Sequence, residues 1–189
     1  MGHQKSAIEF ADAIVSPVTV AEFKTFARIE NDDEETYLAN LLIATTENAI
    51  KYLGRCLLTQ SMTYRFSEFE DADKVELPYC PLQTIEGFYY LDSDVTWNEV
   101  DSDDYFTVTE SIPGALMFKI GVSQPVKYFD YGFKISYTTG YGDDNTDVPE
   151  SIRQAIMIWA NTGYANKMIA TEPPPEVRSA LSLYRVVHL

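Results

Sequence analysis

Residues 17–66 have the sequence PVTVAEFKTFARIENDDEETYLANLLIATTENAIKYLGRCLLTQSMTYRF, which predicts two helices, a tight stop and the beginning of a strand. Thr19 and Glu22 have the spacing of a capping box, in which each side chain accepts a hydrogen bond from a backbone N–H that the helix leaves unpaired. Val18 and Phe23 flank this cap with the spacing of a hydrophobic staple. The first helix is therefore expected to begin just after Thr19.

A second, longer helix is predicted after a short acidic break. Four carboxylates at residues 32–35 lie at its N-terminus, where the helix dipole favours negative charge. One buried stripe is expected to contain Leu38, Leu41, Leu42, Thr45, Ala49, Tyr52 and Leu53. Gly54 ends the helix, because glycine adopts the left-handed C-cap conformation without steric cost. Residues 59–66 then alternate in the manner of a half-buried strand.

The middle of the chain loses the helical period and predicts a sheet. The expected strands, rich in Tyr, Phe, Val and Ile, are 59–67, 74–77, 83–91, 105–109, 115–120 and 126–138. Turns rich in Asp, Ser, Pro and Gly separate them. Because parallel neighbours need crossover connections of about a dozen residues or more, these short spacings predict antiparallel pairing.

The C-terminal part predicts one long and one short helix. Pro149 occupies the first position of the long helix, where its missing N–H costs nothing. The apolar stripe of this helix is expected to be Ile152, Ala155, Ile156, Trp159 and Gly163, widened by Ile158. Three prolines then form a stiff spacer before a last short helix, 176–186. The fold class predicted is α+β, with an N-terminal helical pair, a central antiparallel sheet, a long C-terminal helix and a short terminal helix.

Charge is the strongest compositional signal. The 189-residue chain has a formal net charge of −15, which argues against a protein that grips DNA through its phosphates. Residues 66–110 contain thirteen acidic residues against Lys74 alone. These are Glu68, Glu70, Asp71, Asp73, Glu76, Glu86, Asp92, Asp94, Glu99, Asp101, Asp103, Asp104 and Glu110. This acidic belt is either an ordinary solvated face or the border of a passage through which DNA slides without sticking.

The sequence favours a protein without catalysis, cofactor or metal. Its two histidines, His3 and His188, lie near the termini, so a Ser-His or Cys-His nucleophile arrangement is not expected. No phosphate-binding or dinucleotide-binding glycine pattern is present. Cys56 and Cys80 are expected to be reduced, partly buried thiols rather than a disulfide. The acidic turn at 143–147 offers oxygen ligands for calcium but lacks a closing bidentate Glu, so a hydrogen-bonded turn is the simpler interpretation.

The sequence also argues against a membrane span and against the binding of stacked bases. No segment approaches the roughly 20 apolar residues that a membrane span needs. Aromatic clusters at 88–90 and 128–133 lack interleaved basic residues, so they are expected in the sheet core and in subunit contacts rather than under stacked bases.

Four blocks in one order resemble the head–tail connector, or adaptor, proteins of long-tailed double-stranded-DNA phages. The first block is AEFKTFARIENDDEE with YLGRCLLTQ, and the second is VELPYCPLQTIEGFYYLD. The third is KISYTTGYGDDNTDVPESIRQAIMIWANTGYANK, and the fourth is VRSALSLYRVV. Together they cover roughly residues 17–186, and their order and spacing carry the specificity of the resemblance.

The resemblance implies a structural protein of the virion neck, made in the host cytoplasm. Twelve copies would form a ring beneath the portal protein, extend the channel for genomic double-stranded DNA, and dock the stopper or tail-terminator protein. DNA would pass through without specific binding. The alternative is a monomeric or small-oligomer assembly or tail-completion module that forms no ring.

Three segments are expected on this basis: an N-terminal leader at 1–16, a connector domain at 17–170, and a proline spacer with a C-terminal docking segment at 171–189. The leader is expected to form a short amphipathic turn or to pack on a neighbour. Residues 151–189 have a net charge of +2 in an acidic chain, and the partner contacts of the docking segment are expected to be Arg178, Leu181, Tyr184 and Arg185. The alternative for this segment is that it folds back on its own body. The residues of the acidic belt expected to face the channel are Asp101, Asp103 and Asp104.

Overall fold

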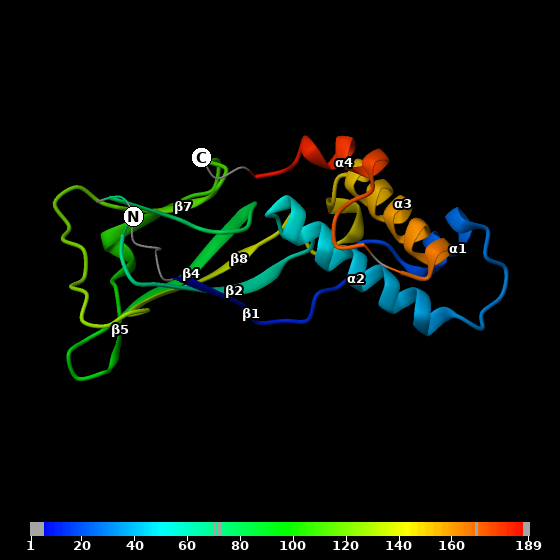
Figure 1. Ribbon diagram of the computed structural model, residues 1–189. Coiled ribbons are helices and arrows are strands. Elements are labelled where there is room, and N and C mark those ends of the chain that lie inside the picture. Colours follow the sequence, from blue (N-terminus) through cyan, green and yellow to red (C-terminus); the bar gives the residue numbers. More distant parts are fainter. Residues whose placement is uncertain (1–5, 70, 72, 169, 187–189) are drawn as a thin grey trace. The chain divides into compact units, whose positions relative to one another are not determined.

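The computed structural model describes residues 6–69, 71, 73–168 and 170–186 (Figure 1). The chain divides into two compact units, and it passes from one to the other three times. We call residues 1–12 with 59–140 the β unit, and residues 13–58 with 141–189 the helical unit.

The β unit contains two antiparallel sheets (Figure 1). Its strands are β1 (Ser6–Phe10), β2 (Gln60–Phe66), β3 (Lys74–Glu76), β4 (Leu82–Leu91), β5 (Trp97–Glu99), β6 (Tyr105–Val108), β7 (Ala115–Phe118) and β8 (Phe133–Thr139). The five-stranded sheet has the order β1-β2-β8-β4-β5, and the three-stranded sheet has the order β3-β7-β6. Every pair of neighbouring strands is antiparallel, so the predicted sheet is confirmed.

A cluster of aromatic rings holds the two sheets together. Strands β2 and β8 bury every second residue, as a strand with one covered face must. Phe88 of the larger sheet lies 5.9 Å from Phe118 of the smaller one, measured between ring centroids. Phe69 fills the space beside them, 4.6 Å from Phe133 and 5.7 Å from Phe118. Such pairs stabilise a core by about 0.5–1.5 kcal/mol each beyond the apolar area that they bury.

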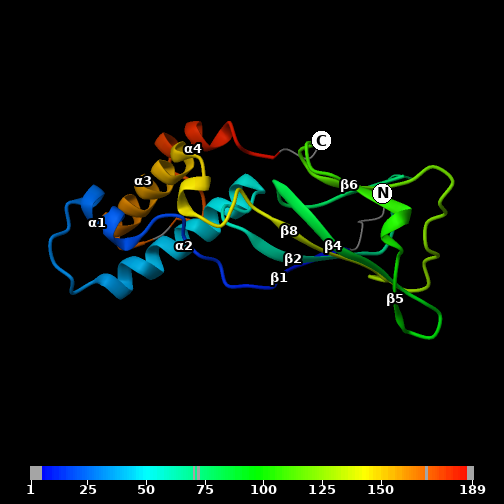
Figure 2. The same cartoon turned by 180° about the vertical axis from the view of Figure 1, so that it is seen from behind.

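The helical unit is built on two long helices (Figure 2). Its elements are α1 (Val20–Ala27), α2 (Glu35–Leu53), the 3₁₀ turn η2 (Asn145–Asp147), α3 (Glu150–Asn166) and α4 (Pro175–Ser182). Helix α2 packs against α3, α1 contacts both, and α4 packs on α3. The predicted α+β class is therefore confirmed, with helices from both ends of the chain in one unit.

The helix signals in the sequence are confirmed at the level of single hydrogen bonds. Glu22 N donates to Thr19 Oγ1 at 3.2 Å, and Thr19 N donates to Glu22 Oε2 at 2.8 Å. Val18 and Phe23 are both buried, as the staple requires. Gly54 ends α2 with φ +65°, in the left-handed region. The stripes expected on α2 and α3 are buried, except that Tyr52 is half-buried and Ile158 is exposed.

Three expectations for the strands and the leader are corrected. Residues 6–10 form β1 on the edge of the larger sheet, where the sequence predicts an amphipathic turn. Most β1 side chains are exposed, so the segment lacks the alternating apolar signal of a half-buried strand. Residues 126–132 are not a strand, because Gly132 N bonds back to Phe129 O and Tyr131 has φ +56°. The three-residue strand β5 has too little sequence for a periodic signal.

Candidate partner-binding surfaces

The C-terminal segment folds back on the helical unit, which is the alternative that the sequence left open. Val177 and Leu181 of α4 are 1% and 0% exposed. The hydroxyls of Tyr184 and Ser151 lie 2.8 Å apart, so Tyr184 is tied to the first turn of α3. Of the four expected partner contacts, Leu181 is thus part of the core and Tyr184 is half-buried, whereas Arg178 and Arg185 are exposed.

Backbone groups continue this attachment beyond α4. Val186 N donates to Leu53 O at 2.8 Å, beside the end of α2. Arg55 Nε donates to the carbonyl of Tyr184, so the corner residue after Gly54 serves as a cap for the terminal segment. The helix itself ends at Ser182, four residues before the expected boundary at 186, and a turn with Tyr184 N bonded to Leu181 O follows. The described part of the segment is therefore held by its own unit as far as Val186.

The two exposed arginines border a basic cavity. It has a volume of about 460 Å³, and its lining residues are Asn48, Lys51, Tyr52, Thr171, Glu172, Arg178 and Arg185. The guanidinium carbon of Arg185 lies 5.0 Å from the centroid of the Tyr52 ring, a cation–π contact. The cavity is a surface on which a carboxylate or phosphate would be favoured.

The expected channel-facing acids lie together in the β unit. Asp101, Asp103 and Asp104 flank or form the 3₁₀ turn η1 (Ser102–Asp104), and the Asp101 carboxylate accepts a hydrogen bond from Asp103 N at 2.9 Å. Asp101 and Asp103 are exposed and Asp104 is half-buried. The turn orders the backbone of the acidic belt and leaves its charges at the surface. Glu70 of the belt, His3 and His188 lie outside the described residues.

An apolar loop lies on the surface of the β unit between β7 and β8. Its exposed large side chains are Ile120, Val126, Tyr128, Phe129 and Tyr131. Ile120 is fully exposed and Val126 is 62% exposed. Exposed apolar patches mark sites of protein–protein contact, and a loop with five such side chains is a candidate for one. The expectation that 128–133 contributes subunit contacts stays a prediction, and the loop is where such contacts would form.

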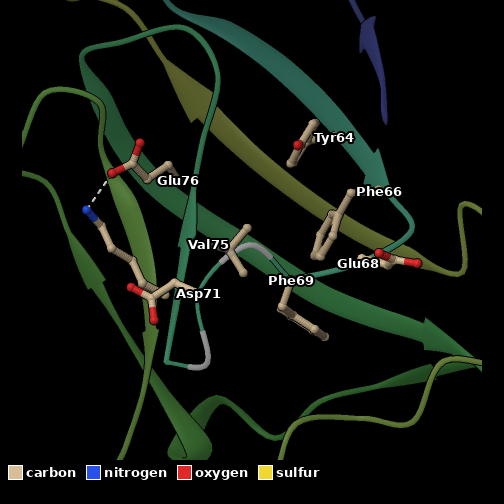
Figure 3. Close-up of a pocket in the computed structure, with 8 residues that line it drawn as sticks. Tyr64, Phe66, Glu68, Phe69, Asp71, Val75 and Glu76 are labelled. Atoms are coloured by element: carbon tan, nitrogen blue, oxygen red, sulfur yellow. Dashed lines mark hydrogen bonds and ion pairs between the residues drawn. The ribbon is translucent and has the colours of Figure 1, made fainter. Parts of the chain in front are cut away.

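The aromatic core opens into a small cavity at β2 and β3 (Figure 3). It has a volume of about 210 Å³, and Phe66, Phe69 and Val75 lie at its centre. Three of the charged groups at its edge are paired, since Lys74 bonds Glu76 at 2.6 Å and Glu68 accepts from Lys127 at 2.7 Å. The pKa of Lys127 is raised, chiefly by its hydrogen bond to Glu68. Paired charges around aromatic rings are typical of a structural edge of the core.

Basic and aromatic side chains do meet on the outer face of the larger sheet, which sequence reasoning missed. Lys134 Nζ lies 4.4 Å from the Tyr89 ring centroid and 4.9 Å from that of Trp97. Arg65 lies 6.0 Å from the Trp97 ring on the same face. These residues are far apart in the sequence and become neighbours only through the register of β2, β8, β4 and β5.

A buried arginine is the other feature without a sequence signal. Arg153 of α3 is 9% exposed and donates to Glu22, to Glu150 Oε2 at 2.7 Å and to the carbonyl of Pro17 at 3.1 Å. It therefore joins the start of α1 to α3. The pKa of Glu22 is lowered, first by the hydrogen bond from Thr19 N and further by Arg153.

Within the described residues, no three His, Cys, Asp or Glu side chains are grouped to hold a metal ion. The acidic turn at 143–147 instead forms a capping box around η2, in which Asp144 N donates to Asp147 Oδ2 at 3.0 Å. Cys56 and Cys80 are both buried thiols. In the part of the chain that the structure describes, no helix is both long enough and apolar enough to cross a bilayer.

Comparisons with known proteins show the fold. No protein-family model and no curated protein matches this sequence. The neck of an empty gene transfer agent particle, computed with C6 symmetry, contains a chain 17% identical, matched over 97% of both chains with a TM-score of 0.80. The neck of the native particle, computed with C12 symmetry, gives 18% identity, 97% of both chains and a TM-score of 0.79. The virion of the native particle contains a chain 18% identical, matched over 96% of both chains with a TM-score of 0.79. This protein therefore shares its whole fold with chains of solved necks and virions.

Proposed function

We propose that this protein is a structural component of a virion neck, where copies of it form a ring between the portal and the next neck protein. The single observation that carries the proposal is the fold likeness over 97% of both chains to chains from gene transfer agent necks. A likeness over both units, and not over one common module, supports the same architectural role. The four sequence blocks resembling phage head–tail connectors point to that role independently.

In this proposal the protein acts by assembling into a ring. The solved necks were computed with C6 and C12 symmetry, and twelve copies of this chain fit both descriptions. The apolar loop between β7 and β8 supplies surface that neighbouring copies would cover. Exposed Arg178 and Arg185 would face a partner, whereas Leu181 and Tyr184 hold the segment that presents them. We keep the portal on one side of the ring and the stopper or tail terminator on the other as the proposed partners.

Such a ring would enclose a channel for DNA. A twelve-fold repeat of Asp101, Asp103 and Asp104 would line or border the passage with carboxylates. Phosphates would be repelled from such a wall, so genomic double-stranded DNA would slide without specific binding. No catalytic step is part of this function.

A monomeric assembly module remains the competing function, because a net charge of −15 opposes self-association in free solution. Native mass spectrometry of the purified protein, alone and with isolated portal, separates the two. A species of about twelve copies, alone or only on the portal, is the expected result. A 21.4 kDa monomer that ignores the portal would contradict the ring and favour the module.

A further inference from the structure

Three cations that form no ion pair among the described residues line the basic cavity of the helical unit. This unit has eight Lys and Arg residues against thirteen Asp and Glu residues. Lys24, Arg153 and Lys167 form ion pairs with carboxylates. Among the described residues, Lys51, Arg178 and Arg185 form none, although carboxylates outnumber cations in the unit.

Contacts within the helical unit fix the side chains that line the cavity. Asn48, Lys51 and Tyr52 share one face of α2, because residues three and four apart are neighbours on a helix. The Tyr52 ring positions the Arg185 guanidinium, and Asn48 Nδ2 donates to Ala170 O at 3.3 Å. Arg178 donates to the carbonyl of Pro173 at 3.4 Å, which leaves most of its five N–H donors free. Glu172, the acidic residue in the lining, forms no ion pair among the described residues.

We propose that this cavity binds the acidic loop at residues 30–35 of an adjacent copy of the same chain. The inference rests on the proposed function, since it assigns the contact that joins neighbours in the ring. Carboxylates of the loop would enter the cavity and accept hydrogen bonds from the two arginines, whose planar donors match a carboxylate in pairs. Lys51 would add a third positive charge. Such a charge-assisted contact would be desolvated at its centre and specific in register.

The loop has the complementary chemistry. Five of its six residues are acidic, and Asp32 and Glu34 are engaged with Lys24 and with Tyr164. Three further carboxylates are exposed and form no ion pair among the described residues: Glu30, Asp33 and Glu35. Three carboxylates of the loop and three cations of the cavity, none of which forms an ion pair among the described residues, thus lie at the surface of one unit.

The acidic loop and the basic cavity of one chain are too far apart to contact each other. The loop ends at Glu35, the first residue of α2, and Lys51 lies sixteen residues further along the same helix. At 1.5 Å per residue the helix separates them by about 24 Å. A contact between them must therefore join two copies through different patches, and such heterologous contacts form a ring where the rotation between copies closes.

Charge reversal tests the contact from both sides. One variant reverses the cavity (Lys51→Glu with Arg178→Glu), and a second reverses the loop (Glu30→Lys with Asp33→Lys). Each should weaken ring assembly on the order of 100-fold at low salt, because like charges then face each other. The variant with all four changes restores opposite charges between the substituted positions and should assemble again. Sedimentation velocity with native mass spectrometry, alone and on isolated portal, measures the loss and the recovery.

The matched control is Arg65→Glu with Lys119→Glu, which changes the net charge as much as the cavity variant but lies in the β unit. Circular dichroism and a thermal melt establish that each variant is folded. Rings formed by the cavity variant as well as by the wild type would overturn the inference. A four-change variant that is folded but stays monomeric would overturn it too. Either result would leave the proposed function standing. Loss of the ring in the control as well would assign the effect to net charge, and this too overturns it. A wild-type protein that is monomeric even on the portal would overturn the proposed function together with the inference.

Two other occupants give different results. If the cavity bound DNA phosphates, wild-type protein would retain duplex DNA at low salt and the cavity variant would not, while both formed rings. If it bound a carboxylate of another neck protein, the cavity variant would form rings that fail to join that protein. Either result would contradict a second copy as the occupant.

Discussion

At the scale of single residues, one carboxylate serves two parts of the helical unit. Glu22 Oε2 caps α1 by accepting from Thr19 N at 2.8 Å, and its other oxygen accepts from Arg153 of α3. Arg153 is nearly buried, so its charge needs this pairing and the additional bonds to Glu150 and Pro17. The carboxylate that caps α1 therefore also joins α1 to α3.

The lowered pKa of Glu22 makes a prediction about pH. A carboxyl group whose pKa is depressed in the folded state stabilises the protein above its unfolded-state pKa, near 4.5, and loses this effect as the pH falls through the folded-state value. Glu22→Gln should therefore lower the free energy of unfolding at neutral pH. The difference from wild type should shrink at pH values progressively below 4.5. Urea unfolding over that range measures it.

A control variant, Glu86→Gln, removes one exposed carboxylate of the β unit and should change the unfolding free energy by less than about 0.5 kcal/mol. No difference between Glu22→Gln and wild type at neutral pH, or a difference that grows in acid, would contradict the role assigned to Glu22.

At the scale of elements, α4 shows how a short helix is stabilised by packing. Eight residues are too few for a stable isolated helix in water. Pro175 is its first residue, where a fixed φ favours helix formation, so the three prolines begin α4 as well as separating it from α3. Burial of Val177 and Leu181 then holds it on its own unit.

Leu181→Ala should lower the free energy of unfolding by about 2–4 kcal/mol, because it leaves a cavity under α4. Leu183→Ala, two residues further on and 85% exposed in wild type, is the matched control and should cost less than about 0.5 kcal/mol. Urea unfolding followed by circular dichroism compares them. Equal, small effects of the two substitutions would show that α4 is not docked in solution. Deletion of 173–189 would uncover this core, so surface charges test partner docking more cleanly than truncation does.

At the scale of the whole molecule, charge is distributed unequally between the units. The β unit has six Lys and Arg against sixteen Asp and Glu, a net of −10, whereas the helical unit has a net of −5. The acidic belt belongs to the β unit and the basic cavity to the helical unit. In the proposed ring, each unit would repeat its own charge around the axis.

If the acidic belt borders the DNA passage, Asp103→Lys with Asp104→Lys should slow DNA exit, and added salt should reverse the effect by screening. Asp101 is kept because its carboxylate caps the turn at Asp103 N. Glu47→Lys with Asp143→Lys makes the same change of net charge in the helical unit and should leave exit unchanged. Fluorescence of a DNA dye during ejection gives the rate. Unchanged ejection by the belt variant at low salt would contradict a channel lined by these acids.

The sequence by itself determined the α+β class and the order of the helices and of most strands, because their signals are local. The capping box at Thr19, the glycine at 54 and the apolar stripes of α2 and α3 depend on residues within a few positions of one another. Alternation likewise revealed β2 and β8, each of which buries one face. The sequence also marked Arg178 and Arg185 as partner contacts, which stays a prediction, but it did not reveal the cavity that they line.

Only the tertiary structure decided what depends on distant partners. Strand β1 exists because β2, some fifty residues later, provides its hydrogen bonds, and most of its own side chains remain exposed. Arg153 is buried because Glu22 and Pro17 lie opposite it. The basic cavity needs both α2 and the returning segment after Pro173, so neither half of it is a site in the sequence. Periodicity reports which side of an element is covered, and packing alone determines what covers it.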